Sequence, residues 1–142
     1  DKSILNKPGK LTPEEFEIMK THTVIGADML WDLEVYRNEP LVKYAWQICR
    51  WHHERYDGSG YPDGLKGEDI PIAAQVVSVC DVYDELVSKR VYKDMFSHET
   101  AMHIICEEEK KPFNPLLLEC LKEMSDELIE LYAPGYTDGG AE

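Results

Sequence analysis

Residues 40–70 read PLVKYAWQICRWHHERYDGSGYPDGLKGEDI, and this stretch decides the fold because a helical pattern stops inside it. Up to Glu54, apolar residues recur every three or four positions, which predicts an amphipathic helix over residues 40–54. From Arg55 to Ile70 the pattern gives way to four glycines and one proline. Such a composition predicts a long loop, and a loop of this length in a compact domain is usually functional or disordered.

Helical patterns continue on both sides of this loop. Thr12 is a predicted N-cap, Pro13 occupies the first helical position and Glu15 completes a capping box, so a helix is expected from residue 12 to about 33. No segment shows the alternation of a β-strand. The sequence therefore predicts an all-α fold, a bundle of about five helices with a glycine-rich loop, in one domain over residues 1–134. The other expected helices span residues 71–89, 97–110 and 114–132, and residues 135–142 are expected to form a flexible tail.

The charge balance restricts the class of partner. The 142 residues include 28 acidic and 15 basic side chains, for a formal net charge of −13. This charge argues against non-specific binding to DNA or to an anionic membrane. No apolar run approaches the 18 residues or so that a membrane span needs. The four widely spaced cysteines form no C-x-x-C pair, which favours a reduced protein in the cytoplasm.

Three histidines are candidates for a site. His22 lies at the centre of an apolar stripe on the first predicted helix, so we expect its ring to face the core, where a single histidine usually has a structural role. His52 and His53 end the helix over residues 40–54 and continue two apolar stripes, so both rings are expected to turn inward. Two adjacent buried imidazoles either pack as neutral rings or share a metal ion. The apolar stripe around His22 consists of Ile18, Ile25 and Met29.

The helix over residues 71–89 carries a polar stripe that includes Asp81. This stripe is either a solvated face or the border of a metal pocket, where Asp81 would be a hard oxygen ligand. Basic residues follow it, among them Arg90 and Lys93. They either complement the end of a helix dipole or form a phosphate clamp.

The run from His52 to Gly67, HHERYDGSGYPDGLKG, resembles the signature of the HD-GYP domain family, with Gly60, Tyr61 and Pro62 as its GYP. Further similar segments are Lys7 to Thr12, Met19 to His22, Asp81 to Asp84 and Arg90 to Lys93. The resemblance covers about residues 1–120. It implies an HD-domain-like all-α fold and a metal-dependent phosphodiesterase that hydrolyses cyclic-di-GMP in bacterial second-messenger signalling.

The resemblance also implies roles for individual residues. Arg90 and Lys93 match positions that contact the phosphates of cyclic-di-GMP or a related dinucleotide. The loop at Gly60, Tyr61 and Pro62 would lie beside the active site and recognise a partner, such as a diguanylate cyclase or another regulatory domain. The residues that match ligands of a two- or three-metal centre, often of iron or manganese, are His22, His52, His53 and Asp81.

The chain also departs from the family pattern. In the family a His-Asp pair and a nearby Lys precede the segment that matches residues 1–7, so we expect a C-terminal portion without the HD motif and without a catalytic residue of its own. Such a portion would be weakly active or inactive, and an apolar groove exposed on it would favour a homodimer. Cys80 and Glu85 stand where the family usually has small residues. The alternatives are a degenerate module that binds nucleotide or a cyclase without catalysis, and a helical bundle whose histidines only pack.

Overall fold

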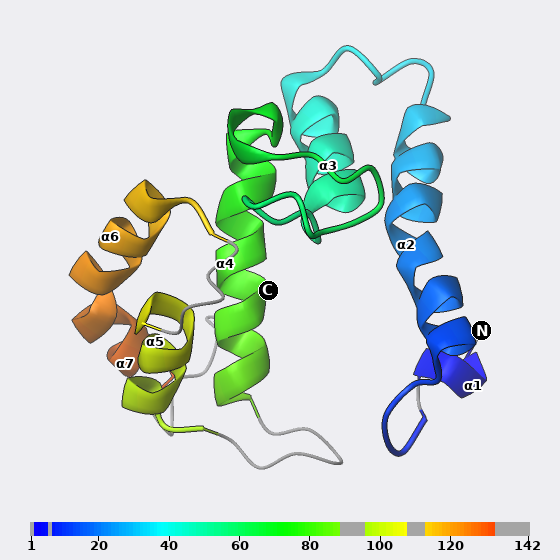
Figure 1. The fold of residues 1–142 in the computed structure, drawn as a ribbon. Helices are drawn as coiled ribbons and strands as arrows, with labels where there is room; N and C mark the ends of the chain where they lie inside the picture. Colours follow the sequence, from blue (N-terminus) through cyan, green and yellow to red (C-terminus); the bar gives the residue numbers. More distant parts are fainter. Residues whose placement is uncertain (1, 6, 89–95, 108–112, 133–142) are drawn as a thin grey trace, which may run out of the picture.

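The computed structural model describes residues 2–5, 7–88, 96–107 and 113–132 (Figure 1). These residues form α-helices joined by loops, with no β-strand among them, which confirms the all-α prediction. The predicted tail, residues 135–142, lies outside the described residues. The helices are α1 (Lys2–Leu5), α2 (Pro13–Trp31), α3 (Pro40–Trp51), α4 (Ile72–Val87), α5 (His98–Glu107), α6 (Pro115–Glu123) and α7 (Ser125–Leu131), and a short 3₁₀ helix η1 covers Gly67–Asp69.

The predicted N-terminus of α2 is confirmed. The Thr12 hydroxyl accepts the Glu15 backbone N–H at 3.2 Å, and the Glu15 carboxylate accepts the Thr12 N–H at 2.7 Å, as a capping box requires. Asn114 caps α6 as predicted, because its side chain accepts the N–H of Leu116. These caps are local in sequence, which is why the sequence alone predicts them.

The helices differ from the prediction in several places. The helix expected over residues 40–54 ends at Trp51, with His52 as its C-cap. The helix expected over residues 114–132 is broken at Met124 into α6 and α7. The break turns α7 so that the Ser125 hydroxyl meets His98 Nε2 at 2.8 Å. Helix α1 was not predicted, since no cap precedes it.

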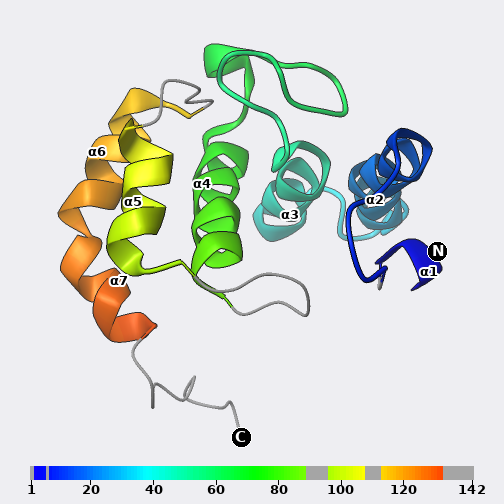
Figure 2. The ribbon, with the colours of Figure 1, turned by 60° about the horizontal axis from the view of Figure 1, so that its bottom comes forward.

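Helix α4 is the centre of the arrangement. In both views it lies between the α2–α3 pair and the group formed by α5, α6 and α7 (Figures 1 and 2). The main apolar core fills the space between α4 and α5–α7, whereas α3 has no fully buried residue. The α2–α3 side therefore buries fewer side chains than the α4–α7 side. The core residues are Val79, Tyr83, Leu86, Val87, Ala101, Ile105, Cys106, Phe113, Leu118 and Leu121.

The prediction that the apolar stripe of α2 faces the core is wrong. Ile18, Ile25 and Met29 are 51%, 55% and 68% exposed, and His22 on the same stripe is exposed as well. The face that α2 turns inward carries small residues instead, with Thr23 and Ala27 fully buried. Small side chains on this face let α2 and α3 approach closely. The exposed stripe and α1 together line a groove of about 250 Å³.

Two further findings concern membrane-spanning helices and disulfides. No helix formed by the described residues is both long and apolar enough to cross a membrane. No disulfide joins the four cysteines, all of which lie in described segments of the chain.

Candidate metal centre

The structure brings His22, His52 and His53 together. Helices α2 and α3 run antiparallel, so the middle of α2 lies beside the C-terminus of α3 (Figure 1). One ring nitrogen from each histidine lies within 4.8 Å of the other two. The ring centroids are 5.4 Å apart for His22 and His52, 5.0 Å for His22 and His53, and 4.1 Å for His52 and His53. Three of the four predicted metal ligands thus form one group.

Backbone contacts fix the tautomers of two of these rings. His22 Nδ1 lies 2.7 Å from the Met19 carbonyl oxygen, and His52 Nδ1 lies 2.8 Å from the Ile48 carbonyl oxygen. A carbonyl oxygen only accepts, so each Nδ1 must carry the proton and donate it. In the neutral rings, Nε2 then carries the lone pair. This is the usual orientation of a metal-binding histidine, whose second nitrogen is held by a backbone carbonyl.

The two lone pairs face each other across a short gap. His22 Nε2 and His52 Nε2 are 3.4 Å apart. Two nitrogen ligands at about 2.0–2.1 Å from one metal ion lie about 2.9 Å apart in octahedral and about 3.4 Å apart in tetrahedral geometry, so both nitrogens can reach one ion. Without a cation or an extra proton between them, the lone pairs would repel. The donor set therefore fits a divalent metal ion.

His53 is held in its neutral form. Burial lowers its pKa to about 3, helped by the neighbouring His52 and His22 and by the Arg55 guanidinium. A neutral imidazole keeps a lone pair for a metal ion, whereas a protonated one cannot bind. His53 is half-buried, in agreement with the expected inward orientation.

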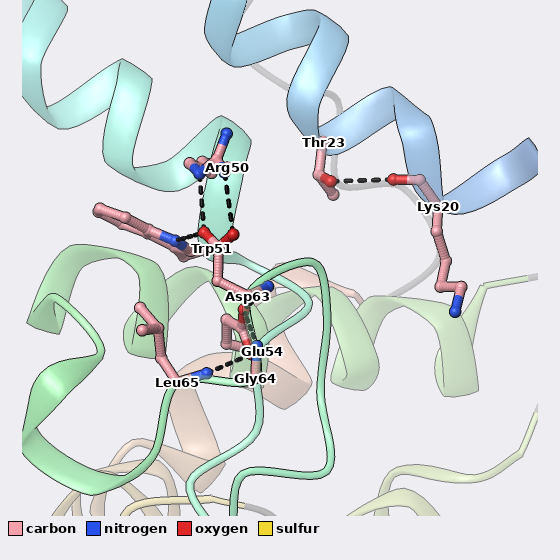
Figure 3. Close-up of polar contacts among 8 residues, drawn as sticks. All are labelled: Lys20, Thr23, Arg50, Trp51, Glu54, Asp63, Gly64 and Leu65. Carbon is pink, nitrogen blue, oxygen red and sulfur yellow. Dashed lines mark hydrogen bonds and ion pairs between the residues drawn. The ribbon is translucent and has the colours of Figure 1, made fainter. Parts of the chain in front are cut away.

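The loop after α3 is held by Glu54, whose side chain is only 2% exposed. Its carboxylate accepts the backbone N–H groups of Asp63 at 2.7 Å, Gly64 at 3.0 Å and Leu65 at 3.1 Å (Figure 3). Hydrogen bonds to a charged acceptor are stronger than neutral ones. One buried side chain next to the histidines thus fixes the far end of the loop.

A second contact ties the same loop to α3. The Asp63 carboxylate accepts two hydrogen bonds from the Arg50 guanidinium, at 2.8 and 2.9 Å, and one from the Trp51 indole N–H at 2.8 Å (Figure 3). The hydrogen bond to Arg50 is the main reason why the pKa of Asp63 lies below its ordinary value. A bidentate pair also fixes direction, so the loop returns against the last turn of α3.

The Gly60-Tyr61-Pro62 turn packs directly against His53. A Cβ on Gly60 would lie 2.4 Å from both the Arg55 nitrogen and the Glu54 Cα, so only glycine fits. The Tyr61 ring lies against the His53 ring, with centroids 4.8 Å apart, and its backbone N–H donates to the His53 carbonyl. The peptide bond between Tyr61 and Pro62 is cis. The turn is therefore part of the wall of the histidine group.

A family model described as "HD domain" matches residues 2–117. The chain belongs to the HD domain family. The match contains the three histidines, the glycine-rich loop and Asp81.

Curated relatives of the HD domain are phosphodiesterases by name. A probable cyclic di-GMP phosphodiesterase of Vibrio cholerae is 41% identical over 131 residues, which are 91% of this chain and 30% of the relative. A cyclic di-GMP phosphodiesterase of Thermotoga maritima is 43% identical over 129 residues, 91% of this chain and 34% of the relative. A 3′3′-cGAMP-specific phosphodiesterase of Vibrio cholerae is 40% identical over 131 residues, which are 92% of this chain and 24% of the relative. The chain thus spans about a quarter to a third of these relatives.

Asp81, Arg90 and Lys93 are the predicted site residues still to be placed. Asp81 is half-buried on α4 and is not a member of the histidine group. Burial lowers the pKa of Arg55, and the charge of Asp81 partly opposes that change. Burial also raises the pKa of Tyr61, and the charge of Asp81 adds to the rise. Glu85 is exposed on the same helix. Arg90 and Lys93 lie outside the described residues, so their predicted phosphate contacts stay predictions.

Sequence reasoning did not assign a role to two residues that shape the HD domain site. Glu54 holds the loop, and Arg55 is in contact with the backbone on either side of His53. A signal was present in the sequence, because charged residues directly after two inward-turned histidines must be buried with partners. Their partners come from the loop and from α4, which no local pattern reveals.

Proposed function

We propose that this HD domain belongs to a metal-dependent phosphodiesterase that hydrolyses cyclic-di-GMP. The observation that carries the proposal is the group of three imidazoles, whose His22 and His52 nitrogens present lone pairs to each other at 3.4 Å. The names of relatives with 41–43% identity support the substrate class. A 3′3′-cGAMP-specific relative makes related cyclic dinucleotides the second substrate to test.

The residues that would hold the metal are His22 and His52 through Nε2, together with His53. Iron or manganese is the proposed metal, and Asp81 the proposed oxygen donor. When bound, such an ion would supply Lewis acidity toward the phosphodiester and lower the pKa of a water molecule there. The chain's own residues would orient the site, because the carbonyls of Met19 and Ile48 hold two rings in the binding tautomer. Arg90 and Lys93 are the proposed phosphate contacts.

The described ligand set is small for such a centre. Two six-coordinate ions offer about twelve positions, and the described residues gather three imidazoles. We therefore propose that the 142 residues alone hydrolyse cyclic dinucleotides weakly or not at all, and that further ligands complete the site in the active enzyme.

The first test is metal content of the 142-residue chain after anaerobic reconstitution with Fe²⁺ or Mn²⁺. We expect bound metal in the wild type, lost in His52→Ala and His53→Ala and retained in His103→Ala, which replaces an exposed histidine of α5 outside the group. Hydrolysis of cyclic-di-GMP and 3′3′-cGAMP is then followed by chromatography. Absence of metal from the wild type, or equal loss in the His103 variant, would refute the proposed centre.

A second candidate function rests on the position of Asp81 outside the histidine group. In that case the domain binds a cyclic dinucleotide or a diguanylate cyclase partner through the Gly60-Tyr61-Pro62 turn without hydrolysis. Cyclic-di-GMP binding by calorimetry, with no product after reconstitution, would favour this function.

The exposed stripe of α2 further supports a homodimer of the chain, which sedimentation measures. The absence of disulfides accords with a cytoplasmic location.

A further inference from the structure

Arg55 makes an unusual set of contacts at the end of α3. Its Nη1 lies within hydrogen-bond distance of three acceptors, the His52 carbonyl oxygen at 3.3 Å, the Glu54 carbonyl oxygen at 3.1 Å and the Ser78 hydroxyl on α4. Nη1 carries two hydrogens, so at least one of them is shared between two acceptors. The two carbonyls lie on either side of His53 along the chain. Arg55 therefore holds the backbone that carries two of the three candidate ligands.

These contacts complete the hydrogen bonding of the backbone there. Carbonyls at the C-terminus of an α-helix have no partner within the helix, and buried ones are costly to leave unsatisfied. The His53 carbonyl accepts the N–H of Tyr61 at 3.2 Å. The carbonyls before and after it, of His52 and Glu54, accept hydrogen bonds from Arg55. All three consecutive carbonyls are thus bonded, so the peptide planes that orient the His52 and His53 rings are fixed.

The other contacts of Arg55 lead into the dense part of the fold. Its guanidinium lies 5.6 Å from the centroid of the Phe113 ring, which is 8% exposed, and Ser78 is 3% exposed. Both partners lie next to the core between α4 and α5–α7, whereas α3 itself has no fully buried residue. Arg55 therefore connects the end of α3, which has no fully buried residue, to the apolar core.

Arginine suits this place better than lysine. Its planar guanidinium can donate to several acceptors at once and stack on an aromatic ring, while a lysine ammonium acts as a point charge. Burial lowers the pKa of Arg55, but the negative charges of Asp81, Asp57 and Glu85 act against that change. The surroundings thus support a charged guanidinium next to the histidines.

We propose that Arg55 is a positioning residue of the metal centre, which sets the directions of the His52 and His53 imidazoles by fixing the carbonyls on either side of His53. The inference rests on the proposed metal site. It predicts that loss of Arg55 changes the geometry and the affinity of the site beyond any general loss of stability.

The test is titration of the 142-residue chain with Co²⁺, followed by visible absorption, which reports ligand geometry. We expect Arg55→Ala to weaken Co²⁺ binding about 10–100-fold, as is typical when a group that orients metal ligands is removed, and to alter the absorption bands. Arg55→Lys should restore part of the affinity, and guanidinium ion at millimolar concentration should partly rescue Arg55→Ala.

Two control variants separate positioning from folding. Arg37 makes the same kinds of contact far from the histidines, because it donates to the Trp31 carbonyl at the end of α2 and lies over the Trp31 ring. Arg37→Ala should leave the Co²⁺ spectrum and affinity unchanged. Ile105→Ala, in the core and outside the Arg55 contacts described above, should lower stability, measured by urea unfolding without metal, and keep the wild-type spectrum.

Each result has a distinct meaning. A wild-type spectrum and affinity in Arg55→Ala would overturn the inference and leave the metal site standing. Equal changes in Ile105→Ala and Arg55→Ala at matched stability would also overturn it, because the role would then be general packing. A wild-type chain that binds no Co²⁺ would overturn both the metal site and the inference.

Discussion

Replacing Glu54 by glutamine tests how the loop beside the histidines is held. In the wild type, Glu54 Oε1 accepts the N–H groups of Asp63 and Gly64, and Oε2 accepts the N–H of Leu65. A glutamine oxygen can keep the first two bonds, but its NH₂ group would face the Leu65 N–H, donor against donor. The variant loses one charge-assisted hydrogen bond and leaves one N–H without an acceptor. Such a change lowers the free energy of unfolding by about 1.5–3 kcal/mol.

The assay is urea unfolding of Glu54→Gln at neutral pH, together with amide hydrogen exchange of the loop. We expect the free energy of unfolding to fall by about 2–3 kcal/mol and exchange to accelerate at Leu65 more than at Asp63. Glu68→Gln is the matched control, since Glu68 is exposed on the same loop and accepts the Tyr56 hydroxyl. A Glu54→Gln protein within about 0.5 kcal/mol of wild type, the range of neutral surface changes, would refute the reasoning.

Three further predictions concern the same region and the C-terminal helices. Gly60→Ala places a Cβ 2.4 Å from the preceding backbone and should destabilise the fold by about 1–3 kcal/mol or more in urea, and an unchanged midpoint would contradict this. The pKa of Asp63 is lowered chiefly by Arg50, so this stabilisation is present above the unfolded pKa and is lost as pH falls through the lowered value. Arg50→Met should therefore flatten the fall of the urea midpoint between about pH 5 and 2, and an unchanged pH profile would disprove the assignment. Ser125→Ala removes the hydroxyl next to His98 Nε2 and should cost about 1 kcal/mol, with α7 exchanging faster; wild-type exchange in α7 would argue against that contact.

The sequence predicts helix starts well because their signals are local. The Thr12 capping box and the Asn114 cap involve residues two or three positions apart, and both are confirmed. The end of α3 could not be predicted, since it depends on Gly60 returning to pack on the Glu54 Cα. No local pattern contains that contact, so the predicted helix was three residues too long.

Candidate ligands were easier to predict than their surroundings. His52 and His53 stand out as adjacent inward-turned imidazoles, and the structure does bring them to His22. The direction of the α2 stripe was predicted wrongly, because counting apolar residues does not tell which face meets α3. The small residues Thr23 and Ala27 decide this through close approach. The position of Asp81 outside the histidine group depends on how α4 packs. No local sequence pattern predicts that packing.

The uneven packing of the fold has a consequence for local unfolding. Helix α2 contributes His22, while the end of α3 contributes His52 and His53, and of these two helices only α2 has fully buried residues, Thr23 and Ala27. Without an ion, the α2–α3 side should open before α4 and its core, since Thr23 and Ala27 are the fully buried residues of these two helices. An ion bound by all three rings would cross-link the two helices. At a free concentration one hundred times its dissociation constant, the ion would stabilise the folded state by about 2.7 kcal/mol. Metal binding would thus supply stability that the few buried side chains of α2 and α3 do not.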